Sequence, residues 1–431
     1  MGFFVMDFRV DKIAVNNVQH VCFVDGDDSP ITGSQVINWA NAYISKEKGH
    51  NTITSQVTEA KHLLVGLNYF FSKQIDLVER VEGGQFLTFA EVSDFSRHCF
   101  KKADVIKRDT ESKGKIASLS SKDVLSPAFK SATFQAESVS NGTAVARMNS
   151  IKSFIEYLFK RLHKGFSNSD TVINKNNTLR NLTLEIKKAK PQNTKVIDVD
   201  KPIFDDEILN AMFEITQVGH PDNPFRNRSQ FRNRLILDTL FGVGMRRGAL
   251  LQAKTSDLHD ENIERIDIEN RINNDDPRLH RPTQKSQSGT APVEPQLMKD
   301  LKKYIENNRV TYPKSEDHDF IFIAESGPTS GQPLSKTGFD YIFETLSFAL
   351  TKKLGREIKV TPHMIRHYWN LDFSEKARKA GISKTETERL RKEIMTWSAK
   401  SNMSDIYDMF DRLKQVRKIK QDIQVKLFNE E

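Results

Sequence analysis

Cysteine is scarce in this chain of 431 residues, because Cys22 and Cys99 are the only two. Two cysteines are too few for a disulfide scaffold or a cysteine-rich zinc module, and such scarcity is typical of a reducing compartment. No apolar run approaches the length of a membrane-spanning helix, and the first residues lack the basic and apolar regions of a signal peptide. We therefore expect an intracellular, cytoplasmic protein with no membrane partner.

Sequence motifs for common cofactors are also missing. No Gly-x-x-x-x-Gly-Lys-Ser/Thr run occurs, which argues against an ATP-driven motor. Gly242, Gly244 and Gly248 do not have the spacing of a dinucleotide fingerprint, and the segment before them reads as a helix rather than a strand. An acidic metal-binding cluster is absent from the sequence as well, so we expect neither a cofactor nor a metal ion.

The chain carries more positive than negative charge and enough apolar residues for packed domains. Its formal net charge of +8 permits a polyanionic partner without requiring one. A length of 431 residues with 37% hydrophobic residues predicts two or three domains. The predicted fold class is mainly α with a small β-sheet, and the sheet belongs to an α+β domain in the C-terminal half.

Changes in periodicity divide the chain into five predicted segments. Residues 1–35 alternate apolar and polar side chains like a hairpin or arm of unknown role, and residues 36–186 show helical periodicity. Residues 187–202 lose that periodicity and are the predicted linker. A mostly helical domain with a small sheet follows at 203–411. We expect residues 412–431 to form a C-terminal helix that docks on a neighbouring protomer or on its own domain.

A predicted helix from about residue 143 to 162 has an apolar stripe with basic residues beside it. The basic residues are Lys152, Lys160, Arg161 and Lys164. A helix face of this kind can bind DNA phosphates, but charged faces are often simply solvated. Both interpretations stay open from this segment alone.

The most informative segment is a predicted helix that opens after Thr361. Its polar residues recur at i, i+3, i+4 and i+7 and so form one stripe: His363, Arg366, His367 and Asn370. Two imidazoles and a guanidinium on one helix face suit a phosphate group. We expect the stripe to face a ligand or a solvent-filled cleft.

Two other interpretations of the stripe compete with phosphate binding. His363 and His367 have the i, i+4 spacing of metal ligands. However, a zincin needs Glu where this chain has Met364, and Arg366 would place a positive charge beside the metal. The same side chains could also be structural polar residues of the helix. Phosphate binding is favoured because a second arginine motif lies upstream.

That upstream motif lies between Leu235 and Leu258, which read as an apolar helix, a glycine break and a short helix that Arg246 opens. The pattern resembles the first arginine motif of the tyrosine recombinase (phage integrase) family, and the resemblance implies that Arg246 is catalytic. The family has an acidic residue three positions later, where this chain has Ala249. In this chain, any stabilisation that the family's carboxylate gives to the arginine motif must come from other residues or be missing.

The polar stripe resembles the second motif of the same family, His-x-x-Arg-His/Lys. The match implies that His363 and Arg366 are catalytic and that His367 supports phosphate binding. Lys285 resembles the catalytic lysine that the family carries on a β-hairpin between its two arginine motifs, because a strand and a Pro-Val pair follow it.

The remaining family residues are a nucleophilic tyrosine and the His or Trp that precedes it. Trp397 and Tyr407 resemble this pair, although their spacing is one residue longer than in the family. Tyr368 is the competing tyrosine. It lies on the opposite face of its helix from His363, so we expect it in the core.

The resemblance implies a site-specific DNA recombinase (integrase) that cuts and rejoins double-stranded DNA through a 3′-phosphotyrosyl intermediate, without cofactor or metal. It implies a helical core-binding domain at 36–186 and an integrase-type catalytic domain at 203–411. In the family these domains close round DNA, with a dimer on each site and a tetramer in the synapse. Integration or excision of a mobile element is the expected role.

Two alternatives stay open. A type IB topoisomerase shares the arginine, lysine, histidine and tyrosine chemistry but acts without paired sites. A DNA-binding regulator that kept the fold and lost cleavage would account for Ala249 and for the long spacing from Trp397 to Tyr407.

Overall fold

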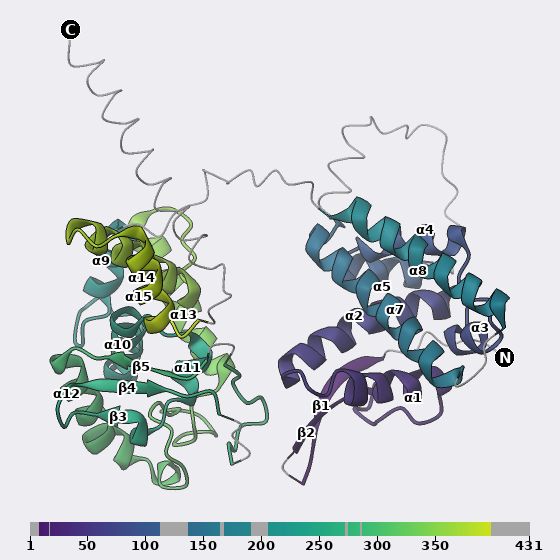
Figure 1. The fold of residues 1–431 in the computed structure, drawn as a ribbon. Helices are drawn as coiled ribbons and strands as arrows, with labels where there is room; N and C mark the ends of the chain where they lie inside the picture. Colours follow the sequence, from purple (N-terminus) through teal and green to yellow (C-terminus); the bar gives the residue numbers. More distant parts are fainter. Residues whose placement is uncertain are drawn as a thin grey trace, which may run out of the picture. The chain divides into compact units, whose positions relative to one another are not determined.

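A computed structural model shows a chain of two compact units, Met1–Ile197 and Asp198–Glu431 (Figure 1). The structure describes residues 8–16, 18–112, 137–163, 168–190, 206–271, 275–284 and 287–397. Helices dominate both units, and the strands form two small antiparallel sheets. The predicted fold class is therefore confirmed, whereas the ends of the five predicted segments stay predictions.

The N-terminal unit is a bundle of helices with one β-hairpin. The hairpin pairs β1 (Arg9–Val15) with β2 (Val18–Val24). The helices are α1 (Gln35–Ala42), α2 (Ile53–Ser72), α3 (Leu77–Glu82), α4 (Phe89–Cys99), α5 (Ala103–Ser112), α7 (Asn141–Leu162) and α8 (Ser169–Ala189). Both strands of the hairpin pack on α2.

Helix α7 is the centre of this bundle because it packs against α2, α3, α4 and α8. Its N-cap Ser140 accepts a hydrogen bond from the backbone N–H of Thr143 at 3.3 Å, which satisfies one of the unpaired donors of the first turn. Met148, Ile151 and Phe154 on its apolar stripe are fully buried. The predicted helix at 143–162 thus begins two residues earlier than expected.

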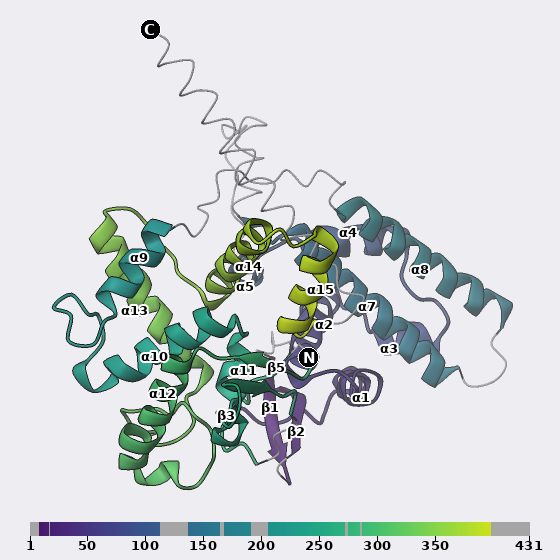
Figure 2. The same ribbon diagram turned by 60° about the vertical axis from the view of Figure 1, so that its left-hand side comes forward.

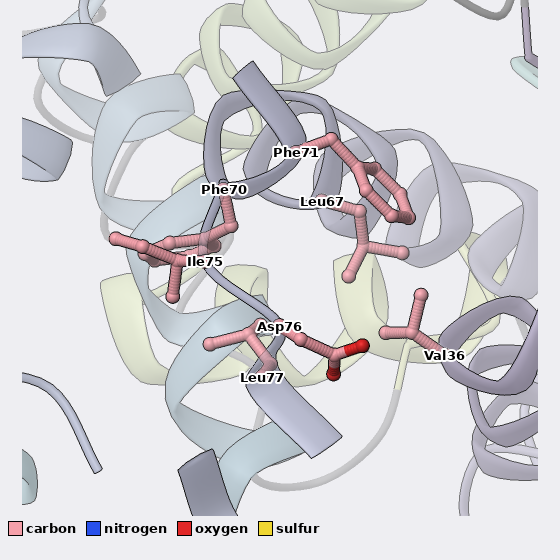
Figure 3. Close-up of a pocket in the computed structure, with 7 residues that line it drawn as sticks. All are labelled: Val36, Leu67, Phe70, Phe71, Ile75, Asp76 and Leu77. Atoms are coloured by element: carbon pink, nitrogen blue, oxygen red, sulfur yellow. The ribbon is translucent and has the colours of Figure 1, made fainter. Parts of the chain in front are cut away.

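A small apolar recess lies between α1, α2 and α3 (Figure 3). It is lined by Val36, Leu67, Phe70, Phe71, Ile75, Asp76 and Leu77. Its one carboxylate caps α3, because Asp76 accepts hydrogen bonds from the backbone N–H groups of Val78 and Glu79. The recess therefore presents apolar surface and an already engaged carboxylate.

The C-terminal unit surrounds a three-stranded antiparallel sheet with helices. The strands are β3 (Leu258–His259), β4 (Arg265–Ile268) and β5 (Gly289–Pro292), in that spatial order. The helices are α9 (Asp206–Ile215), α10 (Asn227–Val243), α11 (Arg247–Gln252), α12 (Pro295–Lys303), α13 (Lys336–Leu354), α14 (Pro362–Lys379) and α15 (Lys384–Ile394). Within the described ranges, no helix is long and apolar enough to cross a membrane.

Helices α10 and α14 have terminal residues that explain their boundaries. Thr361 caps α14 by accepting from the N–H of Met364, and Pro362 occupies the first turn, where its missing N–H costs nothing. Gly244 ends α10 in the left-handed conformation with φ of 66°, which glycine adopts without steric penalty. The arginine motif follows the end of α10 directly, and the polar stripe begins in the first turn of α14.

We predict that Phe154→Ala lowers the free energy of unfolding of the N-terminal unit by about 3 to 5 kcal/mol, because it leaves a cavity beneath α7. Phe154 is fully buried, whereas Phe89 at the start of α4 is 62% exposed. Phe89→Ala should therefore change the free energy by no more than about 0.5 kcal/mol. Urea unfolding of both variants measures the difference, and equal effects would contradict the central position of α7.

Candidate active site

Arg366 on α14 joins the two sequence motifs. Its Nη1 donates to the carbonyl oxygen of Gly244 at 2.5 Å, and its Nη2 donates to the carbonyl oxygen of Met395 at 3.3 Å. The guanidinium carbon lies 5.9 Å from the ring centre of Trp397. One side chain thus connects the end of α10, the start of α14 and the segment after α15. Figure 2 shows α14 and α15 side by side.

The polar stripe of α14 is only partly open to solvent. His363 is exposed and His367 is half-buried, but Arg366 is 4% exposed and Asn370 is fully buried. Asn370 Nδ2 lies 2.8 Å from the carbonyl oxygen of Arg366 and 3.6 Å from the sulfur of Met395. The expectation that the whole stripe faces a cleft is wrong, because the chain after α15 covers its second half.

The two imidazoles stand side by side, with ring centres 4.1 Å apart. The neighbouring protein atoms partly desolvate the imidazole of His363 and so lower its pKa, and the guanidiniums of Arg366 and Arg246 lower it further. Burial also lowers the pKa of His367 to about 4, with smaller effects from His363 and Arg366. Both rings are therefore neutral near pH 7. In the described part of the chain, no cluster of three or more potential metal ligands includes them.

Arg246 occupies the N-cap position of the short helix α11, as the sequence predicts. Arg246 is half-buried, and its positive charge is one of those that lower the pKa of His363. A methyl group on Gly244 would lie 2.7 Å from Met395 Cε and 2.9 Å from the ring of Trp369. The turn before Arg246 therefore packs closely against α14 and the segment after α15.

Ala249 takes the place of the acidic residue that the resemblance leads one to expect. It is 6% exposed and belongs to the main hydrophobic core of the unit. The neighbouring Arg247 forms an ion pair of 2.6 Å with Asp340 on α13. Core packing and this ion pair fix the turn without a carboxylate at position 249.

Lys285 and Tyr407, the predicted lysine and nucleophile, lie outside the described residues. Two described residues near Lys285 in the sequence, Thr283 and Gln287, lie close to α11 and to the segment after α15. A methyl group on Gly248 would come within 2.2 Å of the carbonyl oxygen of Thr283. The backbone N–H of Gln287 donates to the carbonyl oxygen of Thr396 at 3.1 Å.

Tyr368, the competing tyrosine, packs against the main core of the unit as predicted. Its ring lies 6.0 Å from that of Phe241, and its hydroxyl donates to Asp206. Burial raises the pKa of Tyr368, and the bonded carboxylate of Asp206 raises it further. A phenol held in this way is a poor nucleophile.

The basic residues predicted to contact DNA differ in their exposure. Lys152 is half-buried, and Lys160 and Arg161 are exposed near the end of α7. Lys164 lies outside the described residues. The sequence reasoning did not find α8, whose exposed side chains include Asn177 and Arg180. Phosphate binding by any of these residues stays a prediction.

Comparisons with known proteins find similarity to recombinases and integrases. A sequence model of the phage integrase family matches residues 211–378. A curated relative, the tyrosine recombinase XerD of Halalkalibacterium halodurans, is 23% identical over 289 residues, or 62% of this chain and 75% of that protein.

Solved structures of integrases are similar as well. A Tn1549 transposon integrase in complex with circular intermediate DNA is 12% identical with a TM-score of 0.47, over 86% of this chain and 94% of that one. A lambda integrase dimer bound to a core site is 13% identical with a TM-score of 0.32, over 93% and 95%.

We predict that Gly244→Ala destabilises the C-terminal unit by about 2 to 4 kcal/mol, because it adds steric crowding to the strain of a left-handed alanine. Gly355 is the matched control, since it ends α13 with φ of 67° and no atom lies within 4 Å of an added methyl group. Gly355→Ala should cost about 1 kcal/mol, the conformational strain alone. Chemical unfolding compares the two, and equal costs would refute the close packing at Gly244.

The lowered pKa of His367 predicts a loss of stability in acid. Between pH 6.5 and about 4 the unfolded chain binds a proton at this imidazole more readily than the folded chain. The free energy of unfolding therefore falls as the pH falls through this window, with a slope below the limit of about 1.4 kcal/mol per pH unit because the ring is partly solvated. His367→Gln should reduce the slope, and unfolding of both proteins at several pH values measures the change.

Proposed function

We propose that the protein is a site-specific DNA recombinase of the tyrosine type, because a sequence model of the phage integrase family matches residues 211–378. The observation that carries this proposal is the bond from Arg366 to the carbonyl oxygen of Gly244, two residues before Arg246. It brings the two arginine motifs to one place beside His363. Integration or excision of a mobile element is the proposed biological role.

The proposed reaction transfers one phosphodiester bond. The hydroxyl oxygen of Tyr407 attacks the phosphorus, the bond from phosphorus to the 5′-oxygen breaks, and a 3′-phosphotyrosyl link forms. The tyrosine proton passes to His363, and Lys285 gives a proton to the departing 5′-oxygen. The new link keeps the energy of the phosphodiester, so the reverse attack by a 5′-hydroxyl rejoins DNA without ATP.

The two arginines are the proposed clamp for the phosphate. A guanidinium presents a planar fork of donors to non-bridging oxygens and stays charged in the pentacoordinate transition state. The carbonyl groups of Gly244 and Met395 fix the plane of Arg366 before any DNA arrives. Loss of one such preorganised donor typically costs about 3 kcal/mol of transition-state stabilisation.

The histidines and the tryptophan have different proposed tasks. His363 is exposed and its pKa is lowered, so at neutral pH it can accept the proton of the nucleophile. His367 donates to the phosphate or holds the clamp. Trp397 is 7% exposed and packs at the guanidinium of Arg366, where it positions the clamp or donates its indole N–H.

Double-stranded DNA is the proposed substrate, and the proposed location of the protein is inside the cell, associated with DNA. Recombination joins two sites, so we propose one dimer on each site and a tetramer in the synapse. Exposed Lys160 and Arg161 on α7 contribute to the binding of DNA phosphates. Such contacts weaken as salt rises, and salt dependence of binding distinguishes them from buried contacts.

One observation favours a second candidate, a DNA-binding regulator that does not cut. Ala249 removes a carboxylate that the resemblance associates with the arginine motif. A type IB topoisomerase would use the same site but would relax DNA without paired sites. The requirement for two sites separates a recombinase from that enzyme.

We predict that Tyr407 becomes covalently attached to DNA. The wild-type protein is incubated with fragmented DNA of the source organism and quenched in detergent, and nucleotidyl peptides are identified by mass spectrometry. An adduct on Tyr407 that disappears in Tyr407→Phe supports the reaction, and the trapped DNA reveals the site. Tyr368→Phe is the matched control, because that tyrosine packs on the core and should leave the adduct unchanged.

The other outcomes are equally informative. An adduct on a different tyrosine would show that the nucleophile is assigned wrongly. DNA binding without any adduct would favour the regulator, for which Tyr407→Phe changes nothing.

A further inference from the structure

The chain that leads into residue 285 is firmly held from residue 276 onward. Arg278 forms a buried ion pair with Asp276, with Nη2 to Oδ2 at 2.7 Å and Nε to Oδ1 at 2.9 Å. Its Nη1 donates to the carbonyl oxygen of Leu334 at 2.8 Å. Arg281 donates in turn to the carbonyl oxygen of Asp276. The bond to Leu334 ties the segment to another part of the unit, and the other bonds stabilise its fold from within.

The last described part of this segment rests on α11. Gln252 Nε2 donates to the carbonyl oxygen of Pro282 at 2.7 Å. Gly248, one turn earlier on the same helix, lies so close to Thr283 that a methyl group would come within 2.2 Å of its carbonyl oxygen. Helix α11 begins at Arg246, so one short helix supports both the first arginine and the chain that precedes Lys285.

Packing alone does not account for the glutamine at position 252. The side chain is 3% exposed, and its buried Oε1 has no hydrogen-bond partner among the residues that the structure describes. An unsatisfied buried oxygen is destabilising, and an apolar side chain of the same length would avoid that cost. What the glutamine adds is its N–H donor to the carbonyl oxygen of Pro282.

We infer that Gln252 and Gly248 are positioning residues that fix the chain at Pro282–Thr283 and thereby set the proton transfer from Lys285 to the departing 5′-oxygen. In that step the bond from phosphorus to the 5′-oxygen breaks, and the oxygen takes a proton from the lysine ammonium. The inference rests on the proposed function, because it takes Lys285 as the acid. Proton transfer is sensitive to errors of about 1 Å in position, whereas the arginine clamp is held separately through Gly244 and Met395.

A DNA substrate with sulfur in place of the bridging 5′-oxygen tests this inference. A thiolate leaves without protonation, so cleavage of this phosphorothiolate needs no general acid. Gln252→Met keeps the length of the side chain and removes the donor. It should cleave ordinary DNA about 10 to 100 times more slowly than wild type, and the phosphorothiolate within about threefold of wild type. Single-turnover rates on both substrates give the two ratios.

Two controls interpret these ratios. Lys285→Ala removes the proposed acid, so the sulfur substitution should restore its cleavage rate by a larger factor than that of Gln252→Met. Gln230→Met is the matched structural control, because Gln230 is also buried and donates to a backbone carbonyl, that of Phe225 at 3.1 Å. It should change the rates on the two substrates by equal factors. Thermal unfolding of every variant shows how much folded protein each assay contains.

The possible results separate the inference from the proposed function. If sulfur restores cleavage by Lys285→Ala but Gln252→Met is equally slow on both substrates, Gln252 has only a structural role. The inference then fails, while the proposed function stands. If Lys285→Ala is not rescued, Lys285 is not the acid and both fail. Gly248→Ala is the second variant should Gln252→Met not fold, with Gly242→Ala as its control. Failure of both test variants to fold would show a structural role and overturn the inference.

Discussion

The hydrogen bond from Arg366 to the carbonyl oxygen of Gly244 is the interaction on which the site depends. A buried guanidinium is costly unless acceptors surround it, and the left-handed turn at the end of α10 offers a carbonyl group that the helix itself does not use. Met395 offers another from the segment after α15. Because both acceptors are backbone atoms of other segments, Arg366 links three parts of the chain, and its bond to Gly244 helps to hold the arginine motif beside the stripe.

The same positive charges explain the state of the histidines. Arg246 and Arg366 oppose protonation of His363, and Arg366 and His363 oppose protonation of His367. A phosphate bound between the arginines would offset that repulsion and raise the pKa of both imidazoles. In the proposed reaction, His363 would then become a better proton acceptor at the moment when the substrate arrives. This change in the proton affinity of His363 follows from the positions of the charges and requires no conformational change.

The sequence predicts the helices of the site well, because their apolar and polar residues recur with helical spacing and their ends carry capping signals such as Thr361 and Gly244. The burial of Asn370 could not be predicted in this way. It arises from Met395, which is 25 residues further along the chain, and periodicity within one helix does not reveal which later segment covers it. Helix α8 was missed for a different reason, since its sequence is rich in threonine and asparagine and shows only a weak apolar stripe. The lowered pKa values also depend on neighbours that only the folded chain brings together.

Helix α11 shows why the alanine at position 249 is compatible with a working site. A carboxylate three positions after an arginine would orient that arginine by a direct ionic contact. In this chain the helix is oriented from its other sides: Ala249 packs in the core, Arg247 pairs with Asp340, and Gln252 and Gly248 meet the chain before Lys285. A rigidly packed helix positions Arg246 at its N-cap as firmly as a single exposed ion pair would, because buried contacts are stronger than surface ion pairs. The missing acid therefore removes one support from a turn that has several others, so a site with Ala249 can still hold Arg246 in place for catalysis.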